Sequence, residues 1–393
     1  MSGAMVPLRN LIAEKVPTVD PSKFPDEEFE LWSIPAFDAG QPEVILGAEI
    51  GSNKQVVEPG DVLLSKIVPH IRRAWVVSIN SDLRKIASGE WIVFRGNRFD
   101  PNFLRHILVS NDFHSLFMLT VAGVGGSLLR ARPQAVKSLS IFLPPLHEQK
   151  RIAAILDQAH DVRRRASQAE ERFSGLGAAL FWDTFVRDGL EDWPTVTVDS
   201  LVDRSRGGIR TGPFGSQLLH AEFVDSGISV LGIDNAVSNE FRWSGRRFIT
   251  PEKYSGLKRY KVYPGDVLIT IMGTCGRCAI VPPDVGEAIN TKHLCCITLD
   301  GDRCVPEYLY YYFLNHPEAT RHLARQSKGA IMQGLNMGII KDLPVVLPPL
   351  AIQAKFAQRI HEVKAELVNI TAAKSSADQL FTSLQQRAFR GEL

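Results

Sequence analysis

Apolar residues recur at alternating steps of three and four along two long stretches of the chain. A sustained period of about 3.5 residues places a narrow apolar seam on one side of a helix, as in coiled coils. Residues 144–187 and 348–393 are each therefore predicted to form one helix of ~40 residues, or ~60 Å at ~1.5 Å per residue. The predicted seams include Ile152, Ile155, Ala159, Val162, Phe173 and Leu180 in the first stretch, and Phe356, Ile360, Val363, Leu367, Ile370 and Leu384 in the second.

Two matching seams favour pairing of the two helices with each other. The alternative is that each is an ordinary amphipathic helix lying on its own domain. Gly175 and Gly177 interrupt the first stretch, and glycine inside a helix costs about 1 kcal/mol, so we expect that helix to bend or fray there.

Shorter apolar runs bounded by turn residues predict β-strands in the rest of the chain. Helices are predicted over residues 103–119 and from about 306 to 324, each with a proline near its start. Strands and helices together predict the α+β class. The strands fall at residues 44–46, 61–65, 74–77 and 91–94, and again at 230–233, 266–270, 279–281 and 294–299.

Two motifs occur twice, about two hundred residues apart. The Leu-Pro-Pro-Leu that begins at Leu143 returns 204 residues later at Leu347, and the Pro-Gly-Asp-Val-Leu that begins at Pro59 returns 205 residues later at Pro264. Nearly equal shifts at distant points indicate a tandem duplication of a whole domain, because solenoid repeats are far shorter. The predicted organisation is a first domain (1–143), a helix (144–187), a second domain with its linker (188–347) and a second helix (348–393).

Size and charge agree with this organisation. A chain of 393 residues is too long for one compact core, so two domains are expected. The net charge of +2 permits nucleic acid as a partner without requiring it. The first fifteen residues show no signal-peptide pattern and no run approaches the ~18 apolar residues of a membrane span, so we expect a cytoplasmic protein.

The five cysteines all lie in the second half of the chain: Cys275, Cys278, Cys295, Cys296 and Cys304. The spacing of Cys275 and Cys278 allows a zinc site completed by Cys295 or Cys304. The favoured interpretation is that these are small apolar residues of buried strands, because they lie within strand-like apolar segments. An odd number in a cytoplasmic chain also argues against disulfides.

Sequence motifs for catalysis are missing. The chain has no Gly-x-x-x-x-Gly-Lys-Ser/Thr phosphate loop and no Gly-x-Ser-x-Gly elbow, and His147-Glu148 lacks the second histidine of a zincin motif. We therefore predict a binding or scaffolding protein that is not an enzyme and holds neither cofactor nor metal.

Basic residues interleave with aromatic ones, most densely at 241–261. Such side chains neutralise phosphates, and arginine also reads guanine in the major groove. The alternative for any single cluster is an ordinary solvated face. The DNA-binding candidates from basic clusters are Lys66, Arg72, Arg73, Arg95, Arg130, Arg132, Arg206, Arg210, Arg242, Arg246, Arg247, Lys258 and Arg259.

These features resemble the specificity subunits of type I restriction-modification systems. The resemblance rests on the doubled Leu-Pro-Pro-Leu and its helix, on residues 212–216, on residues 273–277 and on residues 333–336. It implies two target-recognition domains, each reading half of a split, asymmetric site in double-stranded DNA, and two antiparallel helices that set the gap, with pseudo-twofold symmetry. The loops add six DNA-binding candidates: Ser216, Gln217, Thr274, Arg277, Gln333 and Asn336.

The resemblance further implies two methyltransferase subunits and restriction or motor subunits as partners that perform the chemistry. Ala351-Ile352 replaces the His147-Glu148 pair of the first copy, so partner docking is expected to differ there. Two alternatives stay open. One is a specificity subunit of a related system in which methylation and cleavage share another chain, and the other is a coiled-coil adaptor without a DNA role.

Overall fold

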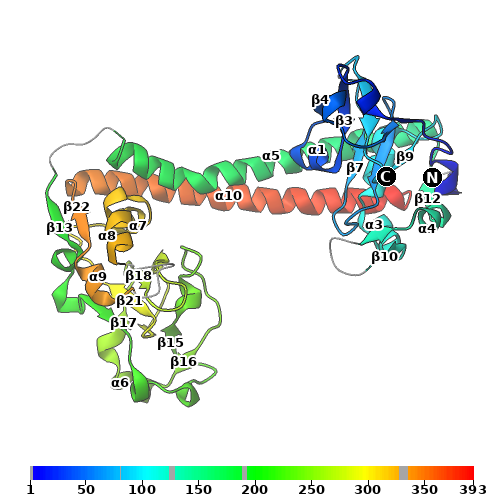
Figure 1. Ribbon diagram of the computed structural model, residues 1–393. Coiled ribbons are helices and arrows are strands. Elements are labelled where there is room, and N and C mark those ends of the chain that lie inside the picture. Colours follow the sequence, from blue (N-terminus) through cyan, green and yellow to red (C-terminus); the bar gives the residue numbers. More distant parts are fainter. Residues whose placement is uncertain (1–2, 80, 124–128, 188–192, 327–334) are drawn as a thin grey trace. The chain divides into compact units, whose positions relative to one another are not determined.

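The computed structural model describes residues 3–79, 81–123, 129–187, 193–326 and 335–393. The chain forms two compact units, both drawn in Figure 1. Unit 1 comprises Met1–Gln168 and Ala372–Leu393, and unit 2 comprises Ala169–Thr371. Each unit contains small sheets, short helices and parts of the two longest helices, which is the α+β class.

Unit 1 is built on two sheets. A five-stranded sheet has the order β2-β5-β8-β3-β4, and a three-stranded sheet has the order β7-β6-β9. The strands are β1 (Ala4–Pro7), β2 (Thr18–Val19), β3 (Glu28–Trp32), β4 (Glu43–Leu46), β5 (Lys54–Val56), β6 (Val62–Ser65), β7 (Ala74–Val76), β8 (Arg84–Ala87), β9 (Trp91–Phe94), β10 (Val121–Ala122), β11 (Arg130–Ala131) and β12 (Ser140–Leu143). The short helices are α1 (Ile34–Ala39), α2 (Pro101–Leu108), α3 (Asn111–Met118) and α4 (Pro133–Ser138).

Unit 2 is built on two four-stranded sheets, β14-β21-β18-β19 and β16-β15-β20-β17. The strands are β13 (Thr195–Thr197), β14 (Ile209–Thr211), β15 (Ile228–Leu231), β16 (Phe248–Ile249), β17 (Lys261–Val262), β18 (Val267–Thr270), β19 (Cys278–Ile280), β20 (Ala288–Asn290), β21 (Leu294–Ile297) and β22 (Pro344–Val346). The short helices are α6 (Pro251–Ser255), α7 (Pro306–Asn315), α8 (Pro317–Gln326) and α9 (Met337–Lys341), with 3-10 turns η7 (Gly215–Gln217) and η10 (Lys258–Tyr260).

The strand pairings of the two units correspond. In unit 1, β3 pairs parallel with β8 and antiparallel with β4, and β5 pairs antiparallel with β8. In unit 2, β15 pairs parallel with β20 and antiparallel with β16, and β17 pairs antiparallel with β20. Likewise β6 lies between β7 and β9 as β18 lies between β19 and β21.

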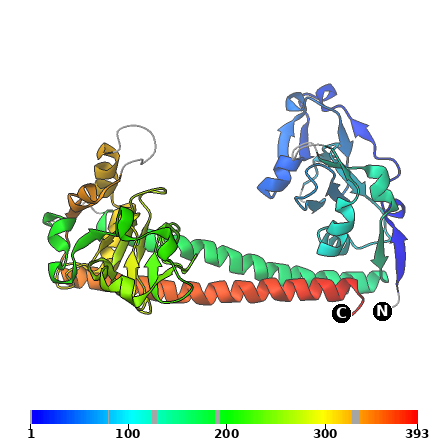
Figure 2. The ribbon, with the colours of Figure 1, turned by 90° about the horizontal axis from the view of Figure 1, so that it is seen from below.

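The two longest helices each have 40 residues: α5 (Leu146–Phe185) and α10 (Leu350–Phe389). Both begin directly after the repeated Pro-Pro pair, because proline has no N–H to contribute to a helical ladder. Within each unit the two lie antiparallel, as Figures 1 and 2 show. In unit 1, the His160 ring lies tilted against Phe381, and Arg163 pairs with Asp378. In unit 2, the Phe185 and Phe356 ring centroids are 5.1 Å apart.

Each helix also completes the core of a unit. In unit 1, Ile152 and Leu156 of α5 and Ala388 of α10 join the core under β6, β9 and α2. In unit 2, Phe181 of α5 and Phe356 of α10 join the core under β18, β21 and α7. Fully burying one such side chain contributes about 1.5–3 kcal/mol, so the helices and the domains stabilise each other.

Along α10 every predicted seam position is buried or half-buried: Phe356, Ile360, Val363, Leu367, Ile370 and Leu384. On α5, Ile152 and Ala159 are buried and Ile155, Phe173 and Leu180 are half-buried, but Val162 departs from the seam because it is 53% exposed. A straight helix turns every 3.6 residues, so its inward face drifts from a strict seven-residue repeat. The expected fraying at Gly175 and Gly177 does not occur, since α5 continues to Phe185, and Gly177 has Tyr311 close to its Cα.

Each of the two medium-length helices predicted from the sequence is instead a pair of shorter helices. Residues 103–119 form α2 and α3, because the Ser110 side chain accepts from Phe113 N and caps a new helix. The predicted helix at 306–324 is α7 followed by α8, because Pro317 begins a second helix after His316.

Candidate nucleic-acid interface

Three of the predicted DNA-binding arginines are held by carboxylates inside their units. Arg73 Nε lies 2.8 Å from Asp38 Oδ1, and Arg210 Nη2 lies 2.8 Å from Asp266 Oδ2. Arg73 and Arg210 are buried, and a buried charge is retained only when it is paired and hydrogen-bonded. Arg95 likewise donates to the buried Asp61. These three belong to the framework rather than to an exposed binding face.

The aspartates of the repeated Pro-Gly-Asp motif, Asp61 and Asp266, are the partners of Arg95 and Arg210 in these ion pairs. Asp61 Oδ2 accepts from Glu58 N and Asp266 Oδ2 accepts from Tyr263 N, each at 2.9 Å, so each aspartate closes the turn before its strand. The arginine that neutralises it differs between the copies, Arg95 in unit 1 and Arg210 in unit 2. The motif therefore marks a buried anchor of the fold.

Three other candidates form ion pairs nearer the surface. Arg130 pairs with Glu90 at 3.2 Å, Arg242 pairs with Glu240 at 2.9 Å, and Arg247 pairs with Asp234. Exposed pairs contribute only about 0–1 kcal/mol each, so these side chains remain available to a stronger anionic partner.

A second group of cations in unit 2 is exposed and is joined by no ion pair to a carboxylate of the described residues. We call Arg206, Arg246, Lys258, Arg259 and Arg277 the exposed cation set. Three of its guanidinium groups lie over aromatic rings: Arg206 over Tyr263 at 4.4 Å, Arg246 over Trp243 at 4.8 Å, and Arg259 over Tyr260 at 4.7 Å from the centroids. Stacking orients a guanidinium and leaves its N–H edge open to a ligand.

The loop residues inferred from resemblance adjoin this set. Tyr260 Oη of η10 donates to Gln217 Oε1 of η7 at 2.9 Å, which joins Gln217 and the neighbouring Ser216 to Lys258 and Arg259. Both Ser216 and Gln217 are exposed. Asn336 caps α9 by accepting from Ile339 N at 3.1 Å, whereas Gln333 lies outside the described residues.

Equivalent loops follow the central strands β6 and β18. In unit 1 the loop carries the half-buried Lys66 and the exposed Arg72, whose Nη1 donates to Asn111 Oδ1 at 2.6 Å. In unit 2 it carries the exposed Thr274 and Arg277. Gly273 has φ 72°, and its counterpart Val68 has φ 49°, a conformation that β-branched residues rarely adopt. Strain of this kind gathers at functional loops.

The remaining candidate, Arg132, is exposed, and its Nε donates to Thr120 O at 3.3 Å. Two further residues were missed from the sequence. Lys292 and His293 lie in the turn between β20 and β21, and burial first, and then the positive charges of Lys292 and Arg247, lower the pKa of His293. Their signal was available, since a Lys-His pair stands between the two apolar segments that form β20 and β21.

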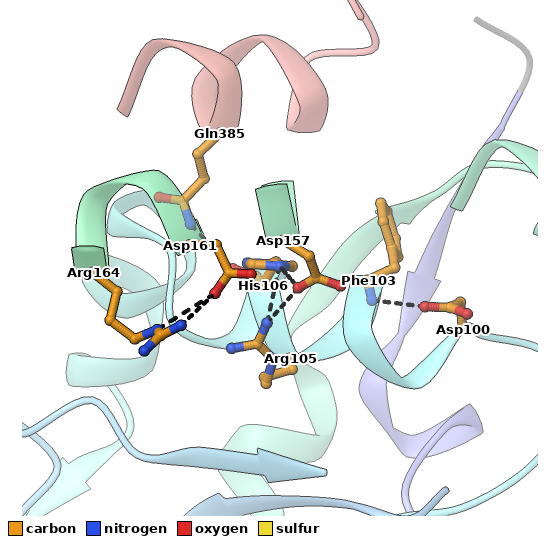
Figure 3. Close-up of polar contacts among 8 residues, drawn as sticks. All are labelled: Asp100, Phe103, Arg105, His106, Asp157, Asp161, Arg164 and Gln385. Atoms are coloured by element: carbon orange, nitrogen blue, oxygen red, sulfur yellow. Dashed lines mark hydrogen bonds and ion pairs between the residues drawn. The ribbon is translucent and has the colours of Figure 1, made fainter. Parts of the chain in front are cut away.

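Unit 1 holds a polar junction between its domain and both long helices (Figure 3). Asp157 of α5 accepts from Arg105 Nη2 and lies against His106 Nε2 of α2, each at 2.8 Å. Gln385 of α10 donates to His106 O at 3.3 Å. Burial and the nearby Arg105 charge lower the pKa of His106 to about 4, so the ring is neutral near pH 7. The junction therefore links α2 to both long helices.

Four of the cysteines are buried, with Cys278 on β19 and Cys295 and Cys296 on β21. Burial raises the pKa of the Cys295 thiol to about 12, which disfavours the thiolate that a metal or a nucleophilic reaction requires. Among the residues that the structure describes, no three His, Cys, Asp or Glu side chains gather as a metal-binding group. No helix in the described ranges is both long and apolar enough to cross a bilayer.

The sequence of unit 2 matches a known protein family. A family model described as the type I restriction modification DNA specificity domain matches residues 232–377, which cover most of unit 2 and the first part of α10. The chain is a relative of the type I restriction specificity subunits.

Two of these relatives come from Escherichia coli. The specificity subunit of the type I restriction enzyme EcoBI is 26% identical over 284 residues, covering 64% of this chain and 58% of that subunit. The specificity subunit of EcoKI, from strain K12, is 25% identical over 336 residues, covering 77% of this chain and 67% of that subunit. The chain therefore matches only about three fifths of the first relative's length.

Two solved structures share the fold. A structure describing complex assembly and conformational transition of the type I R-M system superposes with a TM-score of 0.61 at 20% identity, covering 100% of this chain and 98% of that one. The S subunit of the type I restriction-modification system from M. genitalium superposes with a TM-score of 0.59 at 10% identity, covering 99% and 96%. At these identities the likeness concerns the fold alone.

Proposed function

We propose that this chain is a non-catalytic subunit that recognises a bipartite, asymmetric site in double-stranded DNA. One observation carries the proposal: the same sheet framework and helix start occur in both units, while the surface cations differ between them. Similar frameworks with different side chains on their loops suit two readers of two different half-sites. This doubled framework also supports a tandem duplication with pseudo-twofold symmetry.

The helices α5 and α10 form the spacer in this proposal. Each runs from one unit into the other, and they lie antiparallel within each unit. A paired, coiled-coil-like arrangement over 40 residues is stiff, so its length would set the unread gap between the half-sites.

The chemistry belongs to partners in this proposal. Two methyltransferase subunits and the restriction or motor subunits would bind the chain and act at the site it selects. The helix starts carry exposed leucines, Leu146 at 41% and Leu350 at 36%, which suit partner contacts. At the start of α5, Glu148 pairs with Arg151, whereas Ala351 and Ile352 stand at the start of α10. The two helix starts would therefore contact their partner subunits differently.

A DNA selection tests the proposal directly. The chain, purified with the methyltransferase from its own system, is mixed with a randomised duplex library, and bound DNA is sequenced after gel-shift separation. The expected product is one split site with two unlike halves and a fixed gap. The chain alone should neither methylate nor cut that DNA. Methyl transfer by the pure chain, abolished by a point mutation in it, would contradict the non-catalytic assignment.

One observation favours the adaptor alternative, namely that internal carboxylates already neutralise Arg73, Arg95 and Arg210. An adaptor would bind its protein partners but enrich no DNA sequence. If DNA is enriched and the partner chain itself both methylates and cleaves, the chain serves the related fused system instead.

A further inference from the structure

Two glutamines are the most deeply buried amide side chains of the long helices. Gln149 on α5 is 1% exposed, and Gln353 on α10 is 0% exposed. Each follows its Leu-Pro-Pro-Leu by the same interval, in the first turn of its helix. No step of DNA recognition uses them directly, so their burial requires another explanation.

Both side chains make the same three hydrogen bonds, all to backbone atoms. Gln149 Oε1 accepts from Asp100 N at 2.8 Å, and its Nε2 donates to Pro144 O at 2.8 Å and Arg98 O at 3.3 Å. Gln353 Oε1 accepts from Val305 N at 3.1 Å. Its Nε2 donates to Pro348 O at 2.8 Å and to Arg303 O at 3.2 Å.

The bonds join two different parts of each unit. Pro144 and Pro348 lie where the domain ends and the long helix begins, whereas Arg98, Asp100, Arg303 and Val305 lie in the loops that lead into α2 and α7. In unit 1 the loop is also bonded to the helix that follows it, because Asp100 caps α2 by accepting from Phe103 N, as Figure 3 shows. The amide therefore ties the first turn of the long helix to the base of a domain helix.

Only an amide satisfies this arrangement. The side chain must donate two hydrogen bonds and accept one at the same time, which glutamate cannot do when ionised and leucine cannot do at all. The apolar contacts around it, such as those of Ile152 and Phe356, are not directional. Directional bonds with buried partners are therefore what fixes the angle between helix and domain.

We propose that Gln149 and Gln353 are positioning residues that set the angle at which each unit sits on its spacer helix. The consequence for DNA rests on the proposed function: a fixed angle makes the chain discriminate between neighbouring gap lengths. Loosening either amide would leave the preferred bases of both half-sites unchanged and relax only the gap.

The test uses the full chain in complex with its methyltransferase. Gln149→Leu and Gln353→Leu remove the three bonds and keep an apolar volume, and Gln149→Glu and Gln353→Glu replace the donor with a charge. Gln158→Leu on α5 and Gln386→Leu on α10 are matched controls, because both glutamines are exposed on the same helices. Circular dichroism selects the variants that remain folded, and the leucine variants serve if the glutamate variants do not fold.

A first readout needs no DNA. Spin labels at Asn53 and Arg165, both exposed and both within unit 1, report the helix-to-domain distance in a Cys275→Ser background. Gln149→Leu should broaden that distance distribution, and Gln158→Leu should not. An unchanged distribution in the folded Gln149 variants overturns the positioning role, whether or not the chain binds DNA.

The second readout is the gap-length selection. Both buried-glutamine variants should lose discrimination between neighbouring gap lengths and retain the wild-type bases in each half-site. A broadened distance distribution with unchanged gap selection refutes the link to spacing. Failure of the wild type to select any DNA refutes the proposed function instead, and leaves the spin-label result to decide the positioning role.

Discussion

Removing charge from the exposed cation set should change how DNA affinity depends on salt. The perturbation is the triple variant Arg246→Gln, Lys258→Gln and Arg259→Gln. These three side chains are exposed, and none of them forms an ion pair with a carboxylate of the described residues. Their substitution therefore leaves no internal charge without its partner, and the folded unit should tolerate it.

The expected magnitude follows from counterion release. Each phosphate neutralised contributes a slope of about −0.9 to the plot of log affinity against log salt concentration. If each of the three cations contacts one phosphate, the slope becomes shallower by about 2.7. Between about 50 and 200 mM salt, the wild type would then lose roughly 40-fold more affinity than the triple variant.

The assay is fluorescence anisotropy with the selected duplex and the chain bound to its methyltransferase, over a salt series. The matched control removes the same charge from paired cations of unit 2 that are not DNA-binding candidates: Arg204→Gln, Lys253→Gln and Arg321→Gln, whose partners are Asp199, Glu222 and Glu318. The control variant should change the slope of log affinity against log salt concentration less than the first triple variant does. Equal slopes for the wild type and the first triple variant, or equal losses in both triple variants, would refute a DNA contact by the exposed cation set.

Three further predictions follow from the helices, the strained loop and the polar junction. Inserting one heptad after Ala166 and one after Ile370 lengthens each helix by ~10 Å, so selection should return both half-sites with a gap longer by about three base pairs; return of the original gap by a folded variant would show that the helices do not set it. Val68→Gly should raise the melting temperature of the chain, because a side chain at positive φ costs about 1–2 kcal/mol, whereas Gly273→Val should lower it. A melting temperature that falls in Val68→Gly and rises in Gly273→Val would show that the backbone at these positions is not strained by a side chain. Burial and the Arg105 charge lower the pKa of His106 from 6.5 to about 4, so the unfolded chain binds this proton at a higher pH than the folded chain does. The free energy of unfolding should therefore fall as the pH drops from 6.5 to about 4. Denaturant titrations of His106→Gln should show a weaker dependence of this free energy on pH, and an unchanged dependence would exclude His106 as its cause.

The long helices were predictable from sequence because their seams are local and periodic. The positions on α10 from Phe356 to Leu384 face inward as the spacing indicated. Val162 was misplaced, because a seven-residue repeat does not follow the 3.6-residue turn of a straight helix. The break between α2 and α3 was missed, because a serine that caps a new helix looks like an ordinary polar residue in a helical pattern.

The candidate site was less predictable because the pairing of charges depends on residues far apart in the chain. Arg210 and Asp266 are distant in sequence, as are Arg73 and Asp38, and only the sheets bring them together. A basic run therefore does not reveal which cations face solvent. The buried glutamines show the same limit, since the repeat marked their position but not the backbone atoms they bind.

The first and last strands of each domain pair with each other immediately before the long helix. Met5 lies opposite Phe142 in β1 and β12, and Val196 lies opposite Val345 in β13 and β22. The chain thus enters and leaves each domain at the same place, and loops between the paired strands that contact neither long helix can change without shifting the helix that follows. Under the proposed function, the bases that each domain reads and the gap between the half-sites would therefore be separate traits in evolution: one domain could be exchanged while the two long helices are inherited unchanged.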